Sequence, residues 1–143
     1  MIQLIQIITG GLGALGFALL FNIRGKKLVA AAIGGFLSWG IFLGLGLIMP
    51  GEPIRYFLVS AIISLYSEIM ARWLRTPTTT FIITALIPLI PGGSLYYTMS
   101  AALGGDMADA VTRGLYTLEL ATALALGIVL VSALFRVKKG TRQ

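Results

Sequence analysis

The sequence contains no cysteine and no histidine, and few of its 143 residues are charged. The missing cysteine and histidine exclude disulfides, thiol catalysis, a histidine proton switch and zinc sites built on these two ligands. Charged residues make up 11% of the chain, whereas a soluble domain carries about 25%. So few charges cannot solvate a globular surface, and we therefore expect the chain to lie in a lipid bilayer.

Hydrophobic residues are abundant at 57%, and the net charge is +6. A positive charge can indicate a nucleic-acid partner, but the basic residues lie at the ends of apolar runs. That distribution is typical of membrane topology, so we expect no nucleic-acid partner. No basic stretch precedes the first apolar run, and we expect no cleaved signal peptide.

Five apolar runs approach the length of about 20 residues that a helix needs to cross the hydrocarbon core. They predict an all-α integral membrane protein with five transmembrane helices, forming a single transmembrane domain over residues 1–143. The expected spans are residues 2–22, 28–49, 55–72, 77–103 and 107–135.

The basic residues predict how these spans are oriented. If the spans alternate, nine basic residues lie on one side, while Arg55 and Arg113 lie on the other. The positive-inside rule then places the N-terminus outside and the C-terminus in the cytoplasm. A four-span arrangement, with the third or fourth run in the interface, would break this partition. The nine residues are Arg24, Lys26, Lys27, Arg72, Arg75, Arg136, Lys138, Lys139 and Arg142.

The fourth run is broken by Pro88 and Pro91, which are followed by Gly92 and Gly93. Proline lacks an N–H group and clashes with the preceding turn, whereas glycine permits almost any backbone conformation. In lipid, such a break persists only where protein or a water-filled cavity satisfies the freed backbone groups. The flanking lengths predict two short helices, residues 78–87 and 94–103, and place the break near the bilayer midplane.

Transporters often place substrate sites at such breaks. The N–H groups that begin the second half-helix suit a carboxylate, and the carbonyl end of the first could take an ammonium group or a coupling cation. An amino acid or another small carboxylate fits this polarity. The alternative is a proline-kinked helix whose freed groups are satisfied by neighbouring spans. The substrate-binding candidates at the break are Pro88, Pro91, Gly92, Gly93, Ser94 and Tyr96, which is followed by Tyr97. Ser94 could instead cap the helix.

Acidic residues within the spans are also candidates. Glu119 is the ionisable residue deepest in the fifth run, where it could take up a coupling proton or bind a substrate amine. Its alternative role is to pair with a polar group on a neighbouring helix. Glu68 and Arg72 have the i,i+4 spacing of a helical ion pair. Asp109 and Arg113 share that spacing, and we interpret them as a surface pair.

Several glycines lie inside the first two runs. Gly11, Gly13 and Gly16 match G-x-G-x-x-G, but without a preceding strand we reject dinucleotide binding. These residues instead allow close helix packing. Gly40 and Gly44 form G-x-x-x-G, so a homo-oligomer is possible. The acidic residues form no compact motif, so an intramembrane enzyme is disfavoured. We expect no catalytic residue, no metal site and no cofactor.

Three groups of residues resemble a known family in their order and spacing. The resemblance is to the threonine/serine exporter family, and within it to the small membrane subunit. The three groups are Gly16-Phe17-Ala18 with Phe21-Asn22; Arg72-Trp73 with Pro77; and Ile87-Pro88 with Pro91-Gly92, Ser94, Tyr96 and Met99.

The resemblance implies an exporter subunit in the cytoplasmic (inner) membrane of a bacterium or archaeon. It implies threonine and serine as substrates and a larger partner subunit that carries a cytoplasmic domain. Dicarboxylates such as succinate are the alternative substrates, and a membrane scaffold without transport activity is a further alternative. The match also makes Asn22 a substrate-binding candidate, although at the end of a span asparagine more often terminates a helix.

Overall fold

The computed structural model describes residues 2–140, and the side chains of residues 2–137. Within this part of the chain every regular element is helical, which confirms the all-α prediction. Arg142, one of the basic residues counted above, lies outside the described residues. The elements are α1 (Ile2–Leu20), α2 (Lys26–Gly46), α3 (Glu52–Trp73), α4 (Thr78–Leu86), the 3-10 turn η1 (Ile87–Leu89), α5 (Gly92–Leu103) and α6 (Met107–Gly140).

The predicted spans are present, and the fourth is broken as expected. Among the described residues, α1, α2, α3 and α6 are each long and apolar enough to cross a membrane. The segment of α4 and η1 passes the same test together with α5 as a pair bent by 56°, and it counts as a fifth span if the pair crosses the membrane as one unit. The second half-helix begins at Gly92, two residues before the predicted start. The orientation of the ends across the membrane stays a prediction.

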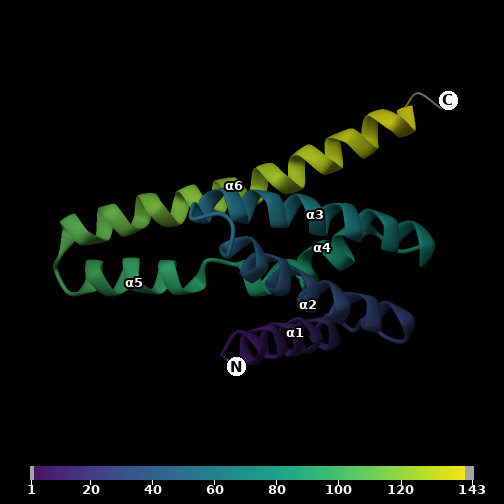
Figure 1. Cartoon of the computed structure of the whole chain (residues 1–143), viewed down its shortest axis with the longest axis horizontal. Coiled ribbons are helices and arrows are strands. Elements are labelled where there is room, and N and C mark those ends of the chain that lie inside the picture. The colour runs from purple at the N-terminus through teal and green to yellow at the C-terminus, as the bar shows by residue number, and fades with distance from the viewer. Residues whose placement is uncertain (1, 141–143) are drawn as a thin grey trace.

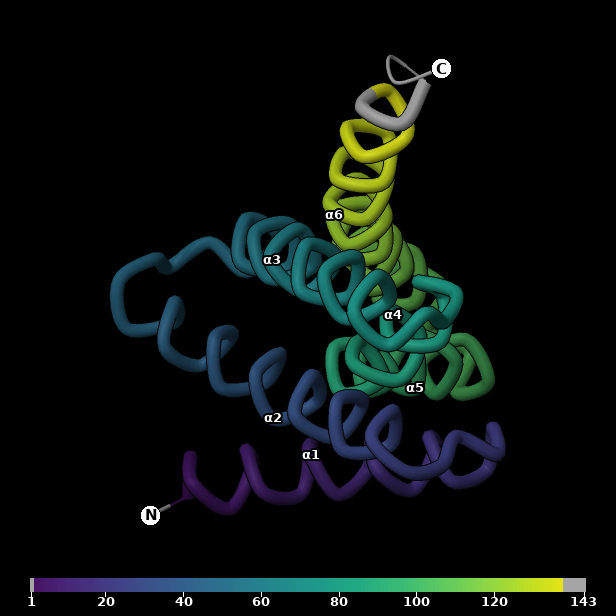
Figure 2. Tube along the Cα trace, turned by 90° about the vertical axis from the view of Figure 1, so that its right-hand side faces the viewer, coloured from purple at the N-terminus to yellow at the C-terminus, as the bar shows by residue number. Residues whose placement is uncertain are grey.

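The helices are arranged around α4. Figures 1 and 2 show α1 and α2 side by side, with α3 and α6 on the other side of the molecule. Helix α4 lies between α2 and α3 and contacts both. Helix α5 packs mainly against α6, and Figure 1 shows this hairpin extending beyond the ends of the other helices. The break therefore lies where the bundle ends and the hairpin begins.

Two apolar clusters hold the bundle together. The first joins α2, α3, α6 and the break through residues that include Phe42, Val59, Leu89 and Leu120. The second surrounds Phe81 of α4 and lies near the other end of the bundle. Large side chains fill the first cluster, whereas the second consists mainly of alanines around Phe81, so α4 and the break are packed on several sides.

Glycines allow several of the helix contacts. A Cβ atom added at Gly11 or Gly35 would collide with side chains across the α1–α2 contact, so the predicted close packing is present there. Gly10 of α1 contacts Pro88, so the break lies level with the middle of α1. A Cβ atom added at Gly40 or Gly44 would have no neighbour from another segment within 4 Å among the described residues, and the homo-oligomer contact suggested by their spacing stays a prediction.

The α5–α6 turn is fixed by its own hydrogen bonds. Gly105 has φ 84°, a left-handed conformation that glycine adopts without strain. The backbone N–H of Asp106 donates to the Ala101 carbonyl at 3.0 Å, which closes the end of α5. The Asp106 carboxylate then accepts a 3.0 Å hydrogen bond from the N–H of Asp109 and caps α6. Helix α6 is thereby directed back along α5.

Candidate functional site

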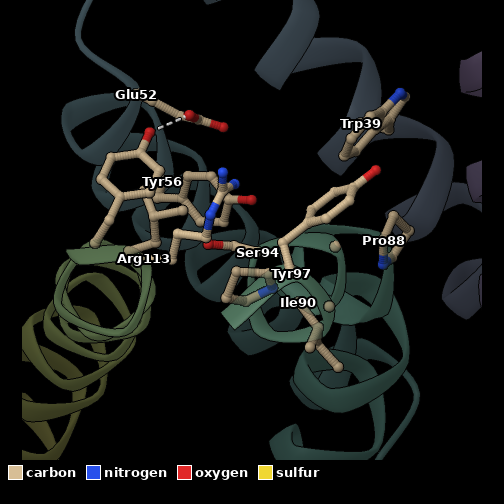
Figure 3. Close-up of a pocket in the computed structure, with 13 residues that line it drawn as sticks. Trp39, Glu52, Tyr56, Pro88, Ile90, Ser94, Tyr97 and Arg113 are labelled. Carbon is tan, nitrogen blue, oxygen red and sulfur yellow. Dashed lines mark hydrogen bonds between the residues drawn. The ribbon is translucent and has the colours of Figure 1, made fainter. Parts of the chain in front are cut away.

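A cavity of about 510 Å³ lies at the break, within the size range of small-ligand sites (Figure 3). Its walls come from α2, α3, α5, α6 and the break itself. The lining residues are Trp39, Glu52, Tyr56, Pro88, Ile90, Pro91, Gly92, Gly93, Ser94, Tyr97, Arg113, Tyr116 and Leu120.

The backbone of the break leaves hydrogen-bond donors at the cavity. Pro91 has no N–H group, and the Gly92 N–H is bonded to the Ile90 carbonyl at 2.6 Å. The first helical hydrogen bond of α5 runs from the Leu95 N–H to the Pro91 carbonyl at 3.0 Å. The N–H groups of Gly93 and Ser94 precede that bond, so α5 offers them no carbonyl acceptor. The positive end of the α5 dipole therefore lies at the cavity wall.

Arg113 is the cationic residue among the described residues that line the cavity. Its Nε donates to the Asp109 carboxylate at 2.6 Å, and Figure 3 shows its guanidinium directed toward the cavity. The ring of Tyr97 lies 5.9 Å from the guanidinium carbon. The pair is exposed, at 47% for Arg113 and 40% for Asp109, as expected for a surface pair. The sequence interpretation nevertheless missed that Arg113 also lines the cavity.

Glu52 is the acidic residue among the described residues that line the cavity. It is the first residue of α3, and its carboxylate accepts a short hydrogen bond from the Tyr116 hydroxyl of α6 (Figure 3). This bond joins α3 and α6 at the edge of the cavity. Arg113 pairs with Asp109 rather than with Glu52, so the cavity presents two opposite charges that do not neutralise each other directly.

The structure brings together most of the residues predicted at the break. Pro88, Pro91, Gly92, Gly93 and Ser94 all line the cavity. No capping hydrogen bond from a side chain is found at the start of α5, so the alternative role considered for Ser94, that of a helix cap, is not seen. Instead, the Ser94 hydroxyl lies 2.7 Å from that of Thr117 in α6, within hydrogen-bond distance. Its proposed contact with substrate stays a prediction.

Two further candidates lie beside the cavity rather than in its lining. Tyr96 is 68% exposed on α5, and the neighbouring Tyr97 faces the cavity in its place. Glu119 is exposed on α6, next to Leu120, which belongs to the lining. A role for Glu119 in proton or substrate binding stays a prediction.

Asn22 lies at the other end of α1, where it terminates the helix. Its φ of 57° is left-handed, a conformation that asparagine tolerates better than most residues. The N–H of Ile23 donates to the Ala18 carbonyl and that of Asn22 to the Leu19 carbonyl, both at 2.9 Å. This pair of bonds is a Schellman motif. The Asn22 side chain accepts a hydrogen bond from Arg24 at 2.9 Å.

This geometry gives opposite predictions for two substitutions of Asn22. We expect Asn22→Gly to retain stability and transport, because glycine adopts the left-handed conformation freely. Asn22→Ala should lower the free energy of unfolding by about 1 kcal/mol, because alanine is strained there. Thermal unfolding in detergent and efflux assays check both. A loss of efflux in a stable Asn22→Gly variant would instead indicate that the carboxamide binds substrate.

The sequence offered weak signals for the residues that its interpretation missed. Arg113 is one of only two basic residues on the predicted outer side, and it lies several residues inside a long apolar helix. Glu52 is the first residue of α3 and directly follows the short connection that contains Pro50 and Gly51. Neither signal predicts that the two residues lie close together, because their proximity depends on how α3 and α6 pack.

Comparison with known proteins adds one match. The family model described as threonine/serine exporter, ThrE, matches residues 6–134. No solved structure matches the chain. The matched range begins in α1 and ends in α6, so it contains every residue that lines the cavity.

Proposed function

Because the chain belongs to the threonine/serine exporter family, we propose that it exports threonine or serine through a site at the broken span. It acts as a membrane subunit together with a larger partner subunit that carries a cytoplasmic domain. It resides in the cytoplasmic membrane of a bacterium or archaeon as a multi-pass protein. The observation that carries this proposal is the cavity at the break, whose lining contains both an acidic and a basic side chain, Glu52 and Arg113.

The substrate carboxylate binds on the side of the cavity formed by Arg113 and the start of α5. Arg113 supplies a guanidinium, and the N–H groups of Gly93 and Ser94 supply neutral donors at the positive end of α5. Arginine suits this role because its planar fork can donate two hydrogen bonds to one carboxylate. Asp109 holds Nε and so positions the guanidinium with its terminal nitrogens available to the cavity.

A dicarboxylate exporter is the second candidate function. It is favoured by the same observation, because Arg113 and the start of α5 would bind a carboxylate of succinate as well as one of threonine. A transport test with both substrates separates the two candidates. A scaffold without transport activity is the third, and it predicts that the shape of the break is unimportant.

The double substitution Pro91→Ala and Gly92→Ala tests the scaffold alternative. Alanine favours a continuous helix, so the break should straighten and the cavity should be lost. We expect threonine counterflow to fall by about tenfold or more, a change of about 1.4 kcal/mol. The measurement uses proteoliposomes that contain the chain with and without the larger subunit, loaded with threonine, serine or succinate.

The matched control changes a second Pro-Gly dipeptide, which precedes α3. Pro50 and Gly51 precede α3 and lie outside the cavity lining, so Pro50→Ala with Gly51→Ala should leave counterflow near the wild-type rate. If the Pro91 and Gly92 double variant also transports normally at normal expression, the scaffold function is favoured and the proposed site is wrong.

A further inference from the structure

Glu52 has no ion-pair partner among the residues whose side chains are described. The ion pairs among the described residues are Glu68 with Arg72 and Asp109 with Arg113. The hydrogen bond that Glu52 does receive comes from the neutral hydroxyl of Tyr116. An anionic side chain that lines a cavity without a cation is suited to bind a cationic group of a ligand.

Neither nearby arginine forms an ion pair with Glu52 among the described residues. Arg55 lies one helical turn after Glu52 in α3, but its guanidinium carbon lies 4.8 Å from the ring centroid of Phe42. Arg113 lines the cavity with Glu52, but its Nε is held by Asp109. The hydrogen bond from Tyr116 fixes the Glu52 carboxylate at the cavity edge without neutralising it. The carboxylate is therefore positioned at the cavity edge without a cationic partner among the described residues.

We propose that Glu52 is the specificity-determining residue of the cavity and binds the ammonium group of a zwitterionic amino acid. This inference rests on the proposed function, since it assumes that substrate occupies the cavity. The carboxylate of the amino acid binds Arg113 and the start of α5, and its ammonium group binds Glu52. A dicarboxylate would bring a second negative charge toward Glu52, and the like charges would repel. Glu52 thus selects amino acids over dicarboxylates.

The test varies the protein and the ligand together. Glu52→Gln removes the charge and keeps an acceptor for the Tyr116 hydroxyl. The ligand pair is L-threonine and 3-hydroxybutyrate, which is threonine without its amino group. Each ligand competes with labelled threonine for counterflow in proteoliposomes that contain the chain and the larger subunit. Succinate is the third competitor.

In the wild-type protein, threonine should inhibit about tenfold more strongly than 3-hydroxybutyrate, because only threonine uses the charge of Glu52. In Glu52→Gln this preference should fall to within about twofold, and the inhibition by succinate should strengthen relative to threonine. Glu68→Gln is the matched control. It changes the same residue type at the other end of α3, beside Arg72, and should keep the tenfold preference.

The outcomes separate this inference from the proposed function. If the wild-type protein with its partner shows no counterflow of threonine, serine or succinate, the proposed function is wrong. If threonine counterflow occurs and Glu52→Gln keeps the tenfold preference for threonine, the role of Glu52 is wrong. Should Glu52→Gln fail to fold, Glu52→Asp provides the second variant. It keeps the negative charge on a shorter side chain, and loss of the preference in a folded, active Glu52→Asp variant would contradict recognition by charge.

Discussion

Replacing Arg113 with glutamine should reduce threonine counterflow by about a hundredfold, equivalent to about 3 kcal/mol. Among the described residues, Arg113 is the only cationic side chain that lines the cavity. Glutamine can still donate a hydrogen bond, but it has neither the charge nor the two-pronged geometry that a carboxylate prefers. The Asp109–Arg113 pair is exposed, so its loss should change the stability of the protein little. The measurement is the initial rate of counterflow in proteoliposomes at matched protein density.

Three other variants show whether charge, geometry or position causes the loss. Arg113→Lys should retain part of the transport, because lysine provides a charge without the planar fork. Asp109→Asn weakens the contact that holds Nε, so we expect a smaller loss than in Arg113→Gln. Arg136→Gln changes an arginine near the other end of α6 and should transport at the wild-type rate. If Arg113→Gln keeps more than half of the wild-type rate, the carboxylate site does not include Arg113.

The break and the spans could be predicted because their causes are local in sequence. Pro88 and Pro91 lack the N–H groups that a helix interior needs, so they interrupt the fourth run by their own chemistry, and Gly92 and Gly93 then begin the second half-helix. Long apolar runs likewise indicate membrane spans without reference to tertiary structure. The end of α1 at Asn22 is local too, because a left-handed residue terminates a helix by its own conformation.

The remaining part of the candidate site depends on contacts between distant segments. Glu52 and Tyr116 meet only because α3 and α6 pack side by side at one register. Tyr96 and Tyr97 are adjacent in sequence, and only the packing of α5 on α6 decides which of them faces the cavity. No periodic pattern in the sequence specifies these helix contacts, so the sequence did not identify Glu52 and Arg113 as members of one site.

The register between α3 and α6 depends on close packing at Gly127, so a substitution there should strongly reduce stability. Adding one methyl group at Gly127, as in Gly127→Ala, should lower the free energy of unfolding by about 3 kcal/mol. The new Cβ would collide with the Ser60 hydroxyl and lie 2.5 Å from the Phe57 carbonyl oxygen and 2.9 Å from the Ala61 nitrogen. Two of these are backbone atoms, which can move away only if α3 itself moves. Thermal or denaturant unfolding in detergent measures the change.

The control for this substitution is Gly40→Ala in α2, where the added methyl group has no atom of another described segment within 4 Å. It should keep or slightly raise stability, because alanine favours a helix more than glycine does. Ser60→Gly combined with Gly127→Ala should recover only part of the lost stability, since the backbone collisions remain. Equal stability of Gly127→Ala and Gly40→Ala would show that α3 and α6 do not pack this closely.

The same contact connects stability to the candidate site. Glu52 lies on α3, whereas Tyr116 and Arg113 lie on α6, so a displacement of α3 changes the spacing between the two charges of the cavity. We therefore expect any Gly127→Ala protein that still folds to lose threonine preference as well as stability. Gly127 lies outside the cavity lining, so such a loss would have to arise from the register of the two helices. An unchanged preference in a destabilised Gly127→Ala protein would mean that Glu52 and Arg113 bind the substrate independently of that register.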